Sequence, residues 1–159
     1  MSRILALIEG LCKAGAFLSA LCMAGIVLLI IVEIFLRIAF GFSTLVSSEF
    51  SGYLLVGVVV LSLGYTLQHR AHIRITLFWD NLSQKWQTRL DIAVACTSTL
   101  ITCFALYHSI LLVFDTYSLG ITADTIVETP LWMPQSVIPV GLFLFLLQLV
   151  NFILRGLRS

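Results

Sequence analysis

Long stretches without a formal charge dominate the pattern of hydrophobic and polar positions along this chain. Four of them cover residues 14–32, 50–67, 92–114 and 131–154, and each is close to the ~20 residues that a helix needs to cross a hydrocarbon core of ~30 Å. Because lipid cannot hydrogen-bond an open backbone, helices are the expected form of these stretches. Strands of a membrane barrel would appear instead as alternating segments of ~10 residues.

The pattern therefore predicts an all-α integral membrane protein with a single membrane domain over residues 1–159. Its four transmembrane helices are expected to be antiparallel along the chain. Hydroxyl groups inside the third span, such as those of Thr99 and Thr102, are expected to bond to carbonyls of their own helix. With their flanking residues, the predicted spans are approximately 14–37, 49–68, 91–114 and 131–154.

The connection between the second and third spans has a different pattern. Apolar side chains recur there at steps of three and four residues, which is one face of a helix. Trp79 and Trp86 lie on this face, and Lys85 lies nearby, a combination that suits the headgroup boundary. The pattern predicts an amphipathic interfacial helix over approximately residues 75–86. Two interpretations stay open, a surface segment without a partner and a horizontal brace in the membrane.

Composition excludes several classes of protein. Hydrophobic residues make up 60% of the chain and charged residues 11%, against roughly 45–50% and 25% in globular proteins. A soluble domain of this length has too much surface to cover with so few polar residues. The composition excludes a cytosolic enzyme, a secreted disulfide scaffold and a disordered tail. Since the sequence also has no Gly-rich phosphate loop, the chain is not expected to hydrolyse ATP.

The positions of the nine basic residues predict the orientation. Lys and Arg favour the cytoplasmic ends of spans, and only Arg37 lies on the opposite side, so both termini are expected in the cytoplasm. Basic residues at the inner surface are expected to contact anionic lipid headgroups. No nucleic-acid partner is expected, since the net charge of +1 gives no indication of one. The eight residues on the predicted cytoplasmic side are Arg3, Lys13, Arg70, Arg74, Lys85, Arg89, Arg155 and Arg158.

Three charged side chains lie near the opposite ends of the first two spans. Glu33 precedes Arg37 by four residues, the favourable order for an ion pair within a helix, and Glu49 opens the second span, where a carboxylate suits a helix N-terminus. One interpretation is a charge cluster that ends the helices at the interface. The other is a polar contact inside the bundle or with another membrane subunit. A proton relay is the weakest interpretation, because no second acid lies deeper in the membrane.

Histidines and cysteines predict no metal and no cofactor. His69 and His72 lie at one end of the second span and His108 lies near the opposite surface, so the three cannot share one ion, and a transmembrane haem would need facing histidines within the spans. The cysteines form no C-x-x-C pair and none falls in a predicted outer loop. They are Cys12, Cys22, Cys96 and Cys103.

An ordered set of short strings along the chain resembles a known family. The strings begin with Glu33-Ile-Phe-Leu-Arg37, continue with Ser48-Glu49 and Tyr53, and include His72-Ile-Arg-Ile-Thr-Leu-Phe78, Leu82-Ser83 and Trp86, followed by Pro130-Leu-Trp-Met-Pro134, Ile138-Pro139-Val-Gly141 and Gln148. Together they resemble the small membrane subunit, of DctQ type, of tripartite ATP-independent periplasmic (TRAP) transporters. The resemblance runs from about residue 10 to residue 155.

The resemblance implies a non-catalytic scaffold in a sodium-coupled importer of the bacterial inner membrane. A periplasmic substrate-binding protein captures an organic anion, such as a C4-dicarboxylate, a sialic acid or another carboxylate. A large membrane subunit of elevator type carries it, and the small subunit stabilises that carrier. The chain is thus expected not to be an enzyme. Candidate partner-contact or structural residues are Glu33, Arg37, Glu49, His72, Arg74, Trp79, Trp86 and Trp132.

Two other functions are weighed against this one. An autonomous proton-coupled multidrug exporter of four spans would use one membrane-embedded acid, and Glu33 is the candidate. This function is disfavoured because Glu33 is paired with Arg37 and lies near the membrane surface. A membrane anchor of a redox complex would bind haem, which the histidine positions disfavour.

Overall fold

The computed structural model describes residues 2–44, 46–69 and 84–156. These residues form five helices, and four of them are long and apolar enough to cross a membrane, which confirms the predicted all-helical class. The helices are α1 (Ser2–Phe40), α2 (Val46–Gln68), α4 (Gln84–Ser118), the short α5 (Trp132–Gln135) and α6 (Val137–Gly156). Residues 75–83 of the predicted interfacial helix lie outside the described residues, and residues 84–86 are the first residues of α4.

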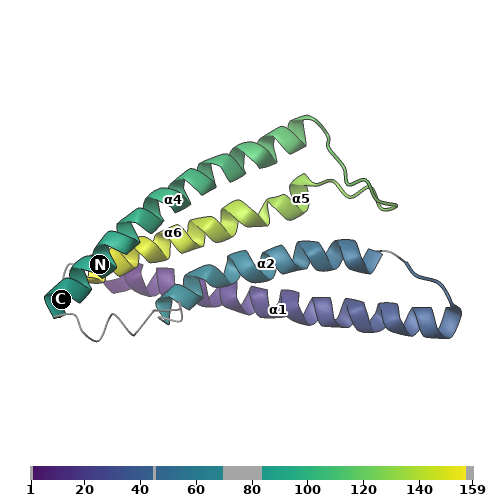
Figure 1. Ribbon diagram of the computed structural model, residues 1–159, viewed down its shortest axis with the longest axis horizontal. Coiled ribbons are helices and arrows are strands. Elements are labelled where there is room, and N and C mark those ends of the chain that lie inside the picture. Colours follow the sequence, from purple (N-terminus) through teal and green to yellow (C-terminus); the bar gives the residue numbers. More distant parts are fainter. Residues whose placement is uncertain (1, 45, 70–83, 157–159) are drawn as a thin grey trace.

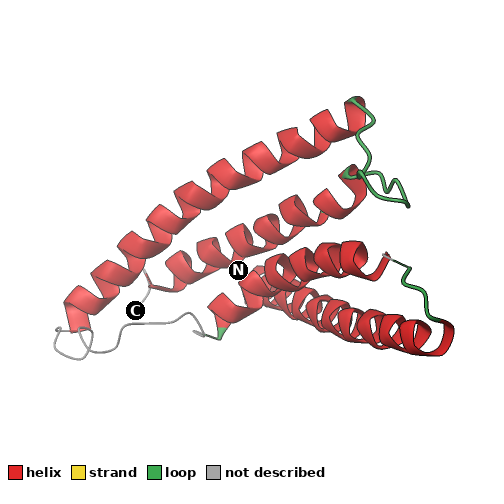
Figure 2. Cartoon of the chain, turned by 45° about the vertical axis from the view of Figure 1, so that its right-hand side comes forward, coloured by secondary structure: helices red, strands yellow, loops and turns green. Residues whose placement is uncertain are grey.

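The four long helices alternate in direction, as the order of spans predicts (Figure 1). Helix α1 packs along α2, α2 along α6, and α6 also contacts α1. Helix α4 packs mainly against α6 on the far side from α1. The connecting segments 41–44 and 119–131 lie at the same end of the bundle (Figure 2), which we call the loop end.

Glycines let the backbones of α1, α2 and α6 approach closely. A Cβ atom added to Gly141 of α6 would lie 2.6 Å from the carbonyl oxygen of Val60, and one added to Gly15 would lie 2.9 Å from the carbonyl oxygen of Leu61. A Cβ atom added to Gly64 would lie 2.9 Å from the sulfur of Cys12. Small residues at helix contacts are the usual means of tight packing in membranes, where apolar burial drives association only weakly.

Buried polar side chains link the same three helices. The Gln148 Oε1 atom accepts hydrogen bonds from Asn151 Nδ2 at 3.3 Å and from Cys12 Sγ at 3.8 Å. The Ser19 hydroxyl donates to the Val58 carbonyl at 2.8 Å. All of these side chains except that of Val58 are buried. Each interhelical hydrogen bond of this kind contributes about 0.6 kcal/mol in membranes.

The remaining surface of the spans is apolar. Leu28 of α1 and Leu100 and Phe104 of α4 are more than 60% exposed, as side chains that face lipid or a partner subunit are. The hydroxyls inside α4 are satisfied by their own helix: Thr99 donates to the Ala95 carbonyl and Thr102 to the Ser98 carbonyl, both at 2.7 Å. The prediction for these two threonines is confirmed.

Candidate partner-contact site at the loop end

Glu33 is the centre of a polar network where α1 ends. Its Oε1 atom accepts hydrogen bonds from the Ser43 hydroxyl at 2.6 Å and from the Thr44 backbone N–H at 3.2 Å, and its Oε2 atom accepts from the Thr44 hydroxyl at 2.5 Å. Arg37 Nη2 lies 3.6 Å from Oε1 and donates to the Ser43 hydroxyl at 3.1 Å. The side chain of Glu33 is only 12% exposed, whereas that of Arg37 is 66% exposed.

The local sequence explains how Ser43 and Thr44 reach Glu33. Helix α1 ends at Phe40, and Gly41 adopts a left-handed conformation with φ of 73° while its N–H bonds to the Arg37 carbonyl at 3.1 Å. Glycine is favoured there because it has no Cβ to clash in this conformation. The reversal returns the chain toward α1, so that the two hydroxyl residues after it meet the carboxylate.

The structure brings the predicted pair Glu33 and Arg37 together, but their ion pair is not the strongest contact of Glu33. An ion pair with one partner mostly exposed contributes little, while the closest contacts of Glu33 are the hydroxyls of Ser43 and Thr44. Sequence reasoning missed these two residues. The available signal was Gly41 directly after the helix, followed by hydroxyl side chains close to an acid.

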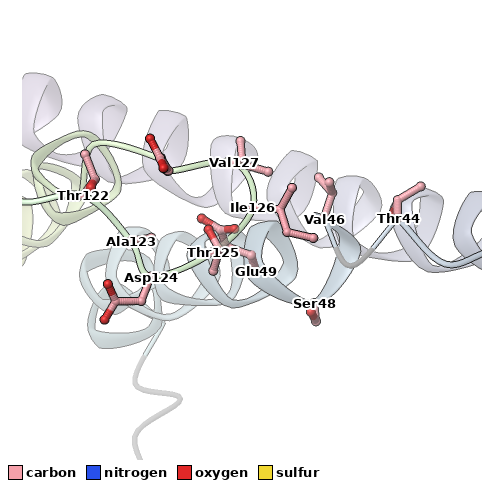
Figure 3. Close-up of a pocket in the computed structure, with 11 residues that line it drawn as sticks. Thr44, Val46, Ser48, Glu49, Thr122, Ala123, Asp124, Thr125, Ile126 and Val127 are labelled. Atoms are coloured by element: carbon pink, nitrogen blue, oxygen red, sulfur yellow. The ribbon is translucent and has the colours of Figure 1, made fainter.

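Glu49 lies in the first turn of α2, as predicted. The Tyr53 hydroxyl donates to its Oε1 atom at 2.8 Å, and the Thr125 hydroxyl from segment 119–131 interacts with the same carboxylate (Figure 3). The Thr129 hydroxyl lies nearby, although its oxygen is buried without a hydrogen-bond partner. Glu49 therefore connects α2 to the segment that joins α4 to α5.

Segment 119–131 folds back on itself as a small hairpin. Thr122 and Pro130 form an antiparallel bridge, and the Ala123 N–H donates to the Thr129 carbonyl at 2.9 Å. The turn closes where the Glu128 N–H donates to the Thr125 carbonyl at 3.1 Å, with Glu128 at φ of 49°. A non-glycine residue in this region is uncommon, and the sequence carries no Gly there to predict the turn.

An open cleft of about 920 Å³ lies between the hairpin and the start of α2. Its lining is acidic: Glu49, Asp124 and Glu128 contribute carboxylates, and none of its lining residues is basic. Thr44, which holds Glu33, also lines the cleft, so the two polar networks border the same space. Among the described residues, no group of three or more His, Cys, Asp or Glu side chains could hold a metal ion.

The other candidate residues lie elsewhere. Trp132 begins α5 and packs edge-on against Tyr117 of α4, with ring centroids 5.6 Å apart, so it joins the ends of these two helices. Trp86 belongs to the first turn of α4, and its side chain is not described. His72, Arg74 and Trp79 lie outside the described residues. The structure thus places Glu33, Arg37 and Glu49 together at the loop end.

The apolar helices and the polar loop end define a multi-pass membrane protein. Residues 26–159 match the family described as tripartite ATP-independent periplasmic transporters, DctQ component, and the chain belongs to that family. The resemblance in the sequence is therefore confirmed, and the protein is a multi-pass protein of the bacterial inner membrane.

A curated relative agrees with this family. The chain is 25% identical over 123 residues to the ectoine TRAP transporter small permease protein TeaB of Halomonas elongata. The match covers 77% of this chain and 63% of the relative, so the chain spans less than two thirds of that relative's length. No solved structure matches the chain significantly.

Proposed function

We propose that this chain is the small membrane subunit of a sodium-coupled TRAP importer, and that it supports the large transport subunit without carrying substrate itself. Membership of the DctQ family supports this role. The substrate is proposed to be an organic acid anion, such as a C4-dicarboxylate, a sialic acid or a similar carboxylate. Because the relative from Halomonas elongata is named for ectoine, ectoine belongs in the same set of test substrates.

One observation supports a scaffold more than a carrier: in the described residues, no span is interrupted near its middle, and the division between α5 and α6 lies at the loop end. The interior side chains of Ser19, Gln148 and Asn151 also bond within the chain. Carriers bind substrate near the bilayer midplane on helices that are interrupted there. In the described residues, α1, α2, α4 and α6 are each continuous, and Gln148 bonds to Asn151 and Cys12. The acid Glu33, which an autonomous exporter would use, is held at the loop end by Ser43 and Thr44.

The proposed contacts divide between two surfaces. The large subunit is proposed to pack against exposed apolar faces of the helices, where side chains such as Leu28 and Leu100 face outward. The loop end is proposed to face the periplasm. The basic residues concentrate at the other end of the molecule, and basic residues favour the cytoplasmic side of a membrane. The acidic cleft at Glu49 then faces the substrate-binding protein, for which a basic docking surface is the complementary chemistry.

The decisive experiment is uptake into proteoliposomes that contain the chain and the large subunit. Transport of a labelled organic anion is expected to require both membrane subunits, the binding protein and an inward sodium gradient. Full transport by the large subunit without this chain would contradict the supporting role. Uptake that persists with potassium in place of sodium would contradict the sodium coupling and leave the role of this chain intact.

The loop-end contacts are tested in the same assay. Replacement of Glu33 and Arg37 together by Gln is expected to reduce recovery of the complex, because it removes the negative charge and one of the two acceptor oxygens that hold segment 41–44. Glu49→Gln is expected to reduce the stimulation of uptake by the binding protein more than it reduces recovery of the complex. Unchanged recovery and unchanged uptake in the double variant would rule out the docking role of Glu33 and Arg37.

A further inference from the structure

Helix α1 projects beyond its neighbour α2 at the loop end (Figure 1). The hydrogen bonds between Thr44 and Glu33 place the start of α2 at the level of Glu33. Helix α1 continues to Phe40, and at 1.5 Å per residue the projecting part is about 10 Å long. We call residues 34–42 the α1 tip.

The α1 tip is apolar and exposed on more than one side. Ile38 is 81% exposed, and Phe40 is 66% exposed. At 100° per residue, these two side chains lie about 160° apart around the helix axis. Phe40 also pairs with Phe42 across Gly41, with ring centroids 6.4 Å apart. A protein partner would cover one face of a projecting helix, whereas lipid can surround it. Apolar exposure on opposite faces therefore favours lipid as the surroundings of the α1 tip.

Arg37 is the charged residue of the α1 tip, and most of its hydrogen-bonding capacity faces outward. A guanidinium group has five N–H donors in a planar fork. In the described part of the chain, the Arg37 guanidinium makes one hydrogen bond, to Ser43, and a 3.6 Å contact with Glu33. Glu33 already accepts three shorter hydrogen bonds, so it leaves the exposed cation available to a second anion.

We propose that the α1 tip lies at the membrane interface and that Arg37 binds the phosphate group of a phospholipid there. The guanidinium fork matches two phosphate oxygens, while its aliphatic stem and the aromatic rings suit the boundary between headgroups and acyl chains. Phe35, which is 65% exposed, adds to the apolar surface that enters the acyl region. The site is a phospholipid-binding site built from Arg37 and the adjacent Ile38, whereas Phe35 lies about 160° from Arg37 around the helix axis and contacts other lipid.

Photocrosslinking from the α1 tip tests this site directly. The photoreactive residue p-benzoylphenylalanine replaces Ile38, and the full chain is reconstituted in nanodiscs that contain equal amounts of phosphatidylglycerol and a phosphate-free galactolipid with the same acyl chains. Mass spectrometry of the irradiated chain gives the ratio of the two lipid adducts. The matched control carries the photoreactive residue in place of Leu100, which is 73% exposed on α4 and lies away from the loop end.

At position 38 the phospholipid adduct is expected to exceed the galactolipid adduct about fivefold, the enrichment that one basic residue near a lipid surface gives. Arg37→Gln is expected to reduce the ratio to that of the lipid mixture, and Arg37→Lys is expected to keep part of the enrichment because it keeps the charge. The ratio at position 100 should match the mixture in every variant. An unchanged ratio in Arg37→Gln would overturn the phosphate site.

A second arm uses cell membranes in which the large subunit is co-expressed. Lipid adducts at position 38 support the proposal, and adducts to another protein at that position would overturn it, because a protein surface would then cover the α1 tip. This outcome is independent of the scaffold role, since a chain that supports the large subunit can have either lipid or protein around its α1 tip.

Discussion

At the scale of single residues, Glu33 is held more by hydroxyl groups than by the arginine of its own helix. Ser43 and Thr44 donate to its two carboxylate oxygens at 2.6 Å and 2.5 Å, while Arg37 lies 3.6 Å away. Hydrogen bonds to an ionised group are stronger than those between neutral groups. The geometry therefore assigns the stability of the α1–α2 connection mainly to residues 43 and 44.

This assignment predicts unequal effects of two substitutions. Thr44→Val keeps the shape of the side chain but leaves one carboxylate oxygen of Glu33 without its donor, so the thermal midpoint in detergent is expected to fall by about 2–4 °C. Arg37→Gln is expected to shift the midpoint by less. The control is Thr97→Val, since the Thr97 hydroxyl bonds within its own helix, to the Ala93 carbonyl. A larger loss in Arg37→Gln than in Thr44→Val would contradict the assignment.

At the scale of helices, close backbone contact determines which neighbours pack. Helices α2 and α6 meet where Gly141 lies against Val60, and α1 and α2 meet where Gly64 lies against Cys12. An apolar stripe cannot select a neighbour in a membrane, because lipid covers it equally well. Steric fit at these small residues makes the selection.

Gly141→Ala is therefore expected to destabilise the bundle by about 1–3 kcal/mol, because its Cβ would overlap the Val60 carbonyl. The matched control is Gly52→Ala in α2, where a Cβ meets nothing within 4 Å. That variant should be neutral or more stable, since Ala favours a helix over Gly by up to about 1 kcal/mol. Unfolding in detergent followed by circular dichroism measures both, and equal stabilities would refute the contact.

Gly64 and Cys12 are expected to behave as a coupled pair. Gly64→Ala alone should destabilise the bundle, because its Cβ would lie 2.9 Å from the Cys12 sulfur. Cys12→Ala removes that sulfur, and the next Cys12 atom lies 3.7 Å away. The double variant should consequently lose about 0.5–3 kcal/mol less stability than the two single losses added together. Additive losses in a double-mutant cycle would show that the sulfur is not the obstacle.

At the scale of the whole molecule, the polar networks of the bundle are separated from its apolar surface. The spans expose apolar side chains over most of their length, whereas the networks around Glu33 and Glu49 lie together at the loop end. The hairpin over residues 121–131 joins that end by contacting Glu49 through Thr125. This arrangement leaves the loop end as the polar face of the protein.

The orientation of this polar face can be measured by labelling. Ile126, at the hairpin turn, is 80% exposed, and Ile126→Cys is expected to react with a membrane-impermeant maleimide added to intact spheroplasts. Gly10→Cys, near the opposite end of α1, should react only after the membrane is opened. The unsubstituted chain, whose four cysteines lie in the helices, provides the background. The reverse labelling pattern would place the loop end in the cytoplasm.

Much of the fold follows from composition along the chain. The four uncharged stretches predicted the number and order of the spanning helices, because transfer into lipid depends on local apolar length. Helices α1 and α4 run beyond the predicted spans, since charged residues such as Lys13 and Arg89 can extend to the interface without breaking backbone hydrogen bonds. The interfacial helix at residues 75–86 and the cytoplasmic termini stay predictions.

The sequence by itself determined the membrane class, the antiparallel order of four spans and the position of Glu49 in a first helical turn, because these depend on neighbours close along the chain. Only the tertiary structure decided that Ser43 and Thr44 hold Glu33, that Thr125 reaches Glu49 and that α6 packs between α2 and α4. Those contacts depend on a left-handed turn at Gly41, an unpredicted hairpin and the steric fit of glycines. Such features join residues whose separation along the chain gives no periodic signal.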